Sequence, residues 1–167
     1  MTMQRLSHGA SSSVKPPRRG AAAVEFALIV PLFVFITLGA IQTGIGLSAA
    51  QTLTSALREG GRLATMDNSK RLKSGQTANQ KVIQDIKNIL TAERIPANQV
   101  NITITHADGS QSGSTFDLSD PANDLASFRI KAVLPYSAIC TTKFFPLTTN
   151  TVSASIVYRK GKTALVQ

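Results

Sequence analysis

No charged side chain lies between Phe26 and Leu57, although 16% of this 167-residue chain is charged. A surface helix of a soluble protein carries charges on its water-facing side every turn or two, so a gap of 32 residues excludes such a helix here. As a helix, the apolar run from Phe26 to about Ala50 would be roughly 37 Å long. This length exceeds the hydrocarbon core of a bilayer, which is about 30 Å thick. The run therefore predicts a membrane-spanning helix with Pro31 near its start.

Two other readings of the apolar run compete with a retained membrane helix. A buried core helix is disfavoured because the rest of the chain is too small to surround it. A cleavable secretory signal is supported by the small residues Ser48, Ala49 and Ala50, which would place the new N-terminus at Gln51. The run is, however, much longer than the roughly 7 to 15 apolar residues of an ordinary signal. We therefore favour a retained helix over a secreted product.

Residues 1–20 precede the helix with four basic side chains and no acidic one. Basic residues on this flank favour a cytoplasmic N-terminus, with the rest of the chain periplasmic or extracellular. The opposite flank is also basic, so the charge bias is not one-sided. Its cations are Arg58, Arg62, Lys70, Arg71 and Lys73.

The helical pattern continues beyond the apolar run, to about residue 66. Leu53, Leu57, Gly60 and Ala64 recur at helical spacing and predict a stalk helix. Small residues also recur at every fourth position, a pattern that lets a neighbouring helix approach closely in lipid. They are Ala40, Gly44, Ser48, Thr52 and Ala56. The alternative is that small residues are simply common in membrane helices.

Residues 67–167 carry the pattern of a small head. An amphipathic helix is expected over Asn79–Arg94, and Pro96 ends it. Alternating apolar residues predict strands at Val100–Ile104, Ser127–Tyr136 and Val152–Tyr158. We therefore expect an α+β fold, in which a long N-terminal helix is followed by one amphipathic helix and a roughly three-stranded antiparallel sheet.

Enzyme and metal chemistry have little support in this sequence. A hydrolase needs a nucleophile, a base and an orienting group, and beyond the leader the chain has a single histidine, His106. The loop aspartates match no calcium-loop spacing, so we interpret them as turn residues: Asp108, Asp117, Asp120 and Asp124. Cys140 is the only cysteine and excludes an intrachain disulfide. We expect no enzymatic activity, no cofactor and no metal site.

The net charge of +9 first suggests a nucleic-acid partner. The basic residues of the head are scattered, and no basic cluster is interleaved with the aromatic residues on which bases stack. We therefore expect membrane lipid and no nucleic acid as a partner.

Glu25 stands at the start of the apolar run, five residues after Gly20. An ionised carboxylate in a membrane costs several kcal/mol unless it is paired or stays at the interface. If the chain were cut after Gly20, the new α-ammonium of Ala21 would lie one helical turn from Glu25. The carboxylate could pair with that ammonium in the same chain or in a neighbouring subunit, or it could be an interfacial glutamate with no partner.

Gly20, Glu25 and Phe26, behind a basic leader and in front of an apolar helix, resemble the processing site of a type IV prepilin. The longer run GAAAVEFALIVPLF, together with ALREGGRLA at residues 56–64, resembles the TadE-like minor pseudopilins of the tight-adherence (Tad/Flp) pilus system. The major Flp pilins are shorter and carry tyrosine where this chain has Phe26. This difference favours a minor subunit or an assembly factor.

The resemblance implies a concrete function. A membrane prepilin peptidase would cut between Gly20 and Ala21, and the protein would take part in the assembly of a Tad/Flp pilus and so in adhesion or secretion. Its partners would be that peptidase, other Tad/Flp pilins and assembly-platform proteins. Cleavage would lower the net charge from +9 to +5. A generic signal-anchored or secreted binding protein of the cell envelope remains the alternative.

Overall fold

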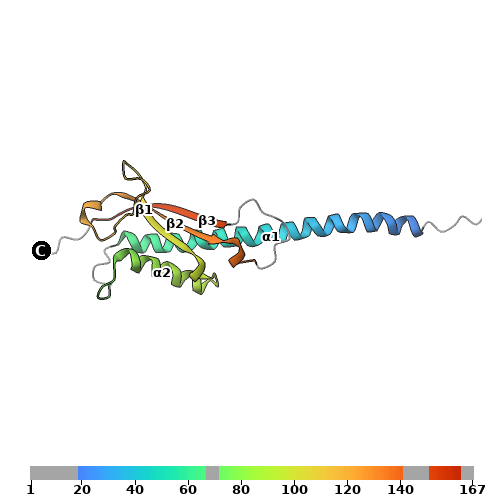
Figure 1. The fold of residues 1–167 in the computed structure, drawn as a ribbon, viewed down its shortest axis with the longest axis horizontal. Coiled ribbons are helices and arrows are strands. Elements are labelled where there is room, and N and C mark those ends of the chain that lie inside the picture. The colour runs from blue at the N-terminus through green and yellow to red at the C-terminus, as the bar shows by residue number, and fades with distance from the viewer. Residues whose placement is uncertain (1–18, 67–71, 141–150, 163–167) are drawn as a thin grey trace, which may run out of the picture. The chain divides into compact units, whose positions relative to one another are not determined.

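The computed structural model describes residues 19–66, 72–140 and 151–162 of the chain. Two α-helices and three strands follow one another as α1 (Arg19–Thr65), α2 (Ala78–Ala92), β1 (Asn101–His106), β2 (Ser127–Pro135) and β3 (Thr151–Arg159) (Figure 1). The expected α+β fold is confirmed. The basic leader, apart from Arg19 and Gly20, lies outside the described residues.

The chain divides into two compact units at Thr37 and Leu38, within α1. The described part of the first unit is helical throughout, and its large apolar side chains are exposed. Phe26 is 69% exposed, Leu28 73% and Phe33 66%. Since exposed apolar surface of this extent is unfavourable in water, this part of α1 requires an apolar environment.

The second unit contains the sheet, in which β2 lies between β1 and β3 and all pairings are antiparallel. In register, Ile104 of β1 pairs with Ile130 of β2, which pairs with Ile156 of β3. Side chains alternate between faces along a strand, so these residues share one apolar face. The expected three-stranded antiparallel sheet is confirmed.

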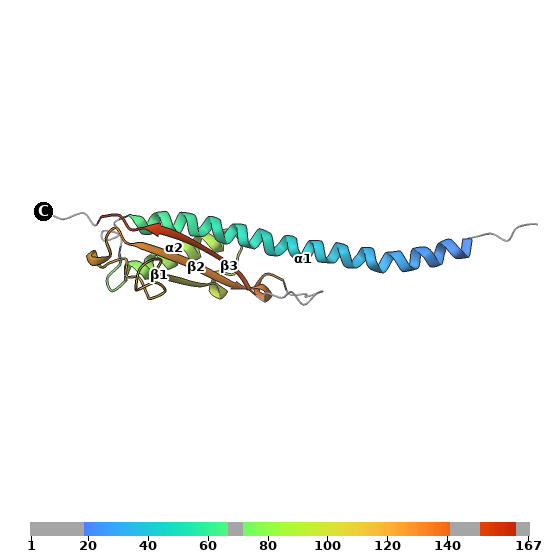
Figure 2. The same ribbon diagram turned by 90° about the horizontal axis from the view of Figure 1, so that it is seen from above.

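One face of the sheet is covered by α2 and by the C-terminal part of α1, which lies along β3 (Figures 1 and 2). The helical residues that pack here include the expected stripe of α1. Leu53, Leu57 and Ala64 come from α1, and Val82, Ile86 and Leu90 come from α2. The C-terminal part of α1 thus belongs to the core of the head.

Helix α2 begins with a capping box. The side chain of Thr77 accepts a hydrogen bond from the amide of Gln80, and the side chain of Gln80 accepts one from the amide of Thr77. Two free amides of the first turn are satisfied in this way. The helix ends at Ala92, two residues earlier than expected, because Arg94 adopts a left-handed backbone with φ 62°.

The polar connection between β1 and β2 contributes to the core, which its composition did not predict. Phe116 is fully buried, and its ring lies 4.7 Å from that of His106 and 5.2 Å from that of Phe128. The side chain of Asn79 holds this connection to α2. It donates to the carbonyl of Phe116 at 2.6 Å and accepts from the amide of Leu118 at 2.9 Å.

Candidate functional site

The predicted processing site lies at the first turn of α1, which begins at Arg19 rather than at residue 21. Gly20 is exposed, and a Cβ atom at this position would meet nothing within 4 Å. No close contact of the fold therefore requires a glycine here. Ala21 follows within the helix.

Glu25 and Phe26 are both exposed on α1. Glu25 is four residues after Ala21, so the helix places the two positions on the same face, about one turn apart. Among the described residues none forms an ion pair with Glu25. The proposed ammonium partner at Ala21 would exist only after cleavage, so the charge pairing stays a prediction.

The row of small residues passes through two environments. Ala56 is 1% exposed and belongs to the core of the head, and Thr52 is half-buried. Ala40, Gly44 and Ser48 are exposed. The C-terminal end of the row thus packs against the chain's own head. Of the five residues, only the three N-terminal ones are free to meet another helix.

A groove of about 470 Å³ lies beside the N-terminal part of this row, between α1 and the head. Gly44 and Ser48 form part of its wall, together with Ile45, Ile95 and Ile139. The packing of another helix against the row of small residues stays a prediction.

Close packing on α1 explains why two adjacent glycines, Gly60 and Gly61, stand in the segment ALREGGRLA. A Cβ atom at Gly60 would lie 2.1 Å from Cγ1 of Ile86 on α2, and one at Gly61 would lie 2.0 Å from Cε2 of Tyr158 on β3. Consecutive residues point about 100° apart around a helix. One glycine pair therefore allows α2 and β3 to approach α1 from two directions. The sequence contained the signal, two successive glycines within a helical pattern, but it did not identify the two partners.

Two tyrosines fix the head to the backbone of α1, and sequence reasoning assigned a role to neither. The hydroxyl of Tyr158 donates to the carbonyl of Arg58 at 3.0 Å, beside Gly61. The hydroxyl of Tyr136 donates to the carbonyl of Gln42 at 2.6 Å. Burial raises the pKa of Tyr136, and the neighbouring Cys140 adds to the increase. The contact of Tyr136 with Gln42 is the most N-terminal of these attachments.

Two of the loop aspartates, Asp117 and Asp120, cap turns. Asp117 accepts from the amide of Ser119 at 2.8 Å, and Asp120 accepts from the amide of Ala122 at 2.9 Å. Asp124 forms an ion pair of 2.9 Å with Lys160, which is buried. These contacts give the interpretation as turn residues a structural basis, since short side chains of this kind commonly cap turns.

Within the described residues, one helix is long and apolar enough to cross a membrane, and it covers Ala22–Thr65. The residues before Gln42 suffice for the crossing. Residues 22–41 span about 30 Å as a helix, the thickness of a hydrocarbon core. A single N-terminal apolar helix of this kind fits a single-pass membrane anchor.

One of three comparisons with known proteins gives a match. Neither the comparison with curated proteins nor the comparison with solved structures gives a match. The match comes from the comparison with protein families. It begins at Gly20, in the predicted processing site, and ends at Arg62, directly after the glycine pair. Over these residues, 20–62, the chain matches the family of TadE-like proteins, which confirms the resemblance predicted from the sequence.

Proposed function

We propose that this protein is a structural minor pilin or pseudopilin that takes part in assembling a Tad/Flp-type pilus. Its role would be structural rather than enzymatic, and its partners would be other Tad/Flp pilins and assembly-platform proteins. The observation that carries the proposal is the TadE-like match over residues 20–62. The match supports a role in Tad pilus systems in general, and the specific role is our inference.

We propose that a prepilin peptidase cuts the chain between Gly20 and Ala21. The basic leader before Gly20 and the apolar helix that follows Ala21 support a boundary at this position. The leader would stay in the cytoplasm, α1 would cross the inner membrane, and the head would lie on the periplasmic or extracellular side. The head could then be incorporated in a pilus.

The packing of α1 argues against cleavage before Gln51 and release of a soluble protein. Ala49 is 4% exposed, and the carbonyl of Gln42 accepts the hydrogen bond of Tyr136. Cleavage after Ala50 would remove both residues and would leave the phenol of Tyr136 without this acceptor. It would also uncover the ring of Tyr136, which lies beside Gly46. Exposing apolar surface to water is unfavourable, so such a product would be destabilised.

Sequencing the N-terminus of the mature protein from its native host tests the proposed processing. We expect a start at Ala21, and we expect Gly20→Leu to block cleavage because its side chain would obstruct the peptidase. Ala22→Leu is the matched control and should still be cut. A mature start at Gln51, or normal cleavage of Gly20→Leu, would contradict the proposal.

Replacement of Glu25 separates processing from assembly. We expect Glu25→Ala to be cut normally but to reduce piliation, because the ammonium at Ala21 loses its carboxylate partner. Glu59→Ala removes another exposed acid from the same helix and should leave piliation unchanged. Equal piliation in both variants would remove the charge-pairing role of Glu25.

A further inference from the structure

The outer face of the sheet is open to solvent in the described part of the chain, because α1 and α2 both pack on the other face (Figure 1). Most of the side chains that point outward carry hydroxyl groups or positive charges. The hydroxyl-bearing residues are Thr103 and Thr105 of β1, Ser127 of β2, and Thr151, Ser153 and Ser155 of β3. This polar face is the other side of the sheet that forms the core.

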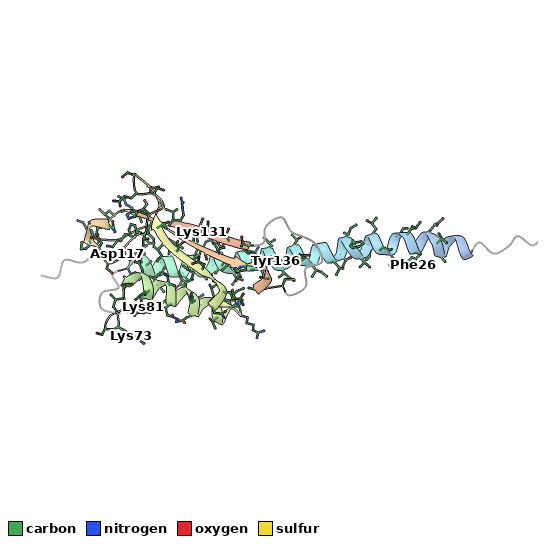
Figure 3. The ribbon with its side chains drawn as sticks, in the orientation of Figure 1. Phe26, Lys73, Lys81, Asp117, Lys131 and Tyr136 are labelled. Carbon is green, nitrogen blue, oxygen red and sulfur yellow. The ribbon has the colours of Figure 1, made fainter. Side chains whose placement is uncertain are left out.

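Three cations lie close together on this face. Arg129 and Lys131 are two residues apart on β2, and their positions are therefore separated by about 6.8 Å along the strand. Arg159 of β3 pairs with Ser127, so it is the diagonal neighbour of Arg129. Diagonal neighbours in an antiparallel pair are about 7–8 Å apart. Figure 3 shows Lys131 on the side of the sheet away from Lys81 of α2.

No acidic strand residue among those that the structure describes neutralises these charges. Among the outward-facing strand residues that the structure describes, none is acidic. Three aspartates of the β1–β2 connection are engaged elsewhere, Asp117 and Asp120 in its own turns and Asp124 in the ion pair with Lys160. Like charges this close on one face of a sheet repel each other. A negatively charged partner would relieve that repulsion.

The remaining side chains indicate which kind of anionic partner fits. Bases of single-stranded nucleic acid stack on aromatic rings, and the described outward-facing strand residues include none. Protein interfaces have an apolar or aromatic centre, whereas the apolar outward-facing strand residues that the structure describes are Val133, Pro135 and Val157, and Val157 lies apart from the other two. Hydroxyl groups both donate and accept hydrogen bonds, which suits a ligand rich in hydroxyl groups.

We propose that the outer face of the sheet binds a linear acidic polysaccharide. Arg129 and Lys131 contact its carboxylates, since arginine forms bidentate hydrogen bonds to such groups, and the threonines and serines contact its sugar hydroxyls. The guanidinium of Arg159 is held in place by a hydrogen bond of 2.7 Å from its Nε to the carbonyl of Leu125. The inference rests on the proposed function for one point, the exposure of the head outside the cytoplasm.

Binding of polygalacturonate by the full-length protein in a zwitterionic detergent tests this surface. Calorimetry at low salt should detect binding that weakens as salt is added, because salt screens exposed charges. The variant Arg129→Gln/Lys131→Gln should bind about tenfold more weakly or worse, as expected for the loss of two hydrogen bonds between charged groups. Thermal unfolding of the same samples shows whether the variant remains folded.

A matched control removes two cations elsewhere. Lys73 precedes α2 and Lys87 lies on it, so Lys73→Gln/Lys87→Gln changes the net charge equally and should alter the affinity by less than about twofold. Equal loss in both variants would mean a general charge effect and would overturn the proposal. So would the absence of binding by the unaltered protein, equal binding of neutral dextran, or tighter binding of a single-stranded oligonucleotide. All of these binding measurements use purified protein and none depends on pilus assembly. A negative result would therefore leave the proposed role in pilus assembly unaffected.

Discussion

The two halves of α1 differ in how far the protein's own fold covers their side chains. Before Gln42, large apolar residues such as Phe26, Leu28 and Phe33 are exposed. After Gln42, the residues facing the head are buried, and most of them are small. They are Ala49, Leu53, Ala56, Leu57, Gly60, Gly61 and Ala64.

The difference shows how one helix can lie in lipid along one half and pack against a protein core along the other. Lipid accepts large side chains on every side of a helix, and a membrane crossing needs only apolar length. Helix α2 and the three-stranded sheet pack closely on α1 only where small residues of α1 leave room for their side chains, as at Gly60 and Gly61. Side-chain size therefore divides α1 into a membrane half and a half bound to the head.

Truncation of a large apolar side chain in each half should have the most unequal effects. Leu57 is fully buried, so Leu57→Ala is expected to lower the free energy of unfolding of the head by about 2–5 kcal/mol. Phe33 is 66% exposed, and Phe33→Ala should change it by less than about 0.5 kcal/mol. Denaturant unfolding in mild detergent, followed by tyrosine fluorescence, measures both. Similar losses would contradict the division of α1.

Adding one methyl group to each of two glycines sharpens the comparison. Gly61→Ala places a Cβ atom 2.0 Å from Cε2 of Tyr158 and should cost about 1–3 kcal/mol. Gly44→Ala meets nothing within 4 Å, so a helix-stabilising gain of up to about 1 kcal/mol is expected. The same unfolding measurement applies. If Gly44→Ala keeps a stable head but reduces piliation, the exposed small residues serve contacts with another subunit.

The smallest expected effect concerns Tyr136, which joins the head to α1 at Gln42. Tyr136→Phe removes one buried hydrogen bond and should cost about 1 kcal/mol. Because the folded-state pKa of Tyr136 is raised above the ordinary value of 10.0, its stabilising contribution is full below pH 10 and is lost as the pH rises through the folded-state pKa. The unaltered protein should therefore lose more stability between neutral pH and pH 11 than Tyr136→Phe does. Parallel pH curves would contradict this assignment.

Periodicity was sufficient to predict the elements of the fold. The helical stripe Leu53, Leu57 and Ala64 and the alternation in the three strands each place apolar residues on one face, and that face is the core. Contacts between distant residues could not be predicted in the same way. Gly61 and Tyr158 are far apart in the chain, and no local pattern joins them.

The least predictable core residue was Phe116. It lies in a connection rich in glycine, serine and aspartate, and two hydrogen bonds with the side chain of Asn79, one donated and one accepted, hold that connection in place. The residues of the candidate site were selected by motif, and the structure adds their surroundings. Gly20, Glu25 and Phe26 are exposed on α1, whereas Ala56 is buried in the chain's own core.

Labelling with a membrane-impermeant maleimide tests the division of α1 most directly. In a Cys140→Ala background, a cysteine would replace either Phe33 or Ser55, both of which are exposed on α1. Since the fold itself shields neither position, any difference in labelling comes from the membrane. We predict that Ser55→Cys is labelled from outside in intact spheroplasts and that Phe33→Cys is labelled only after detergent is added. Labelling of Phe33→Cys in intact spheroplasts, or protection of Ser55→Cys, would contradict the account.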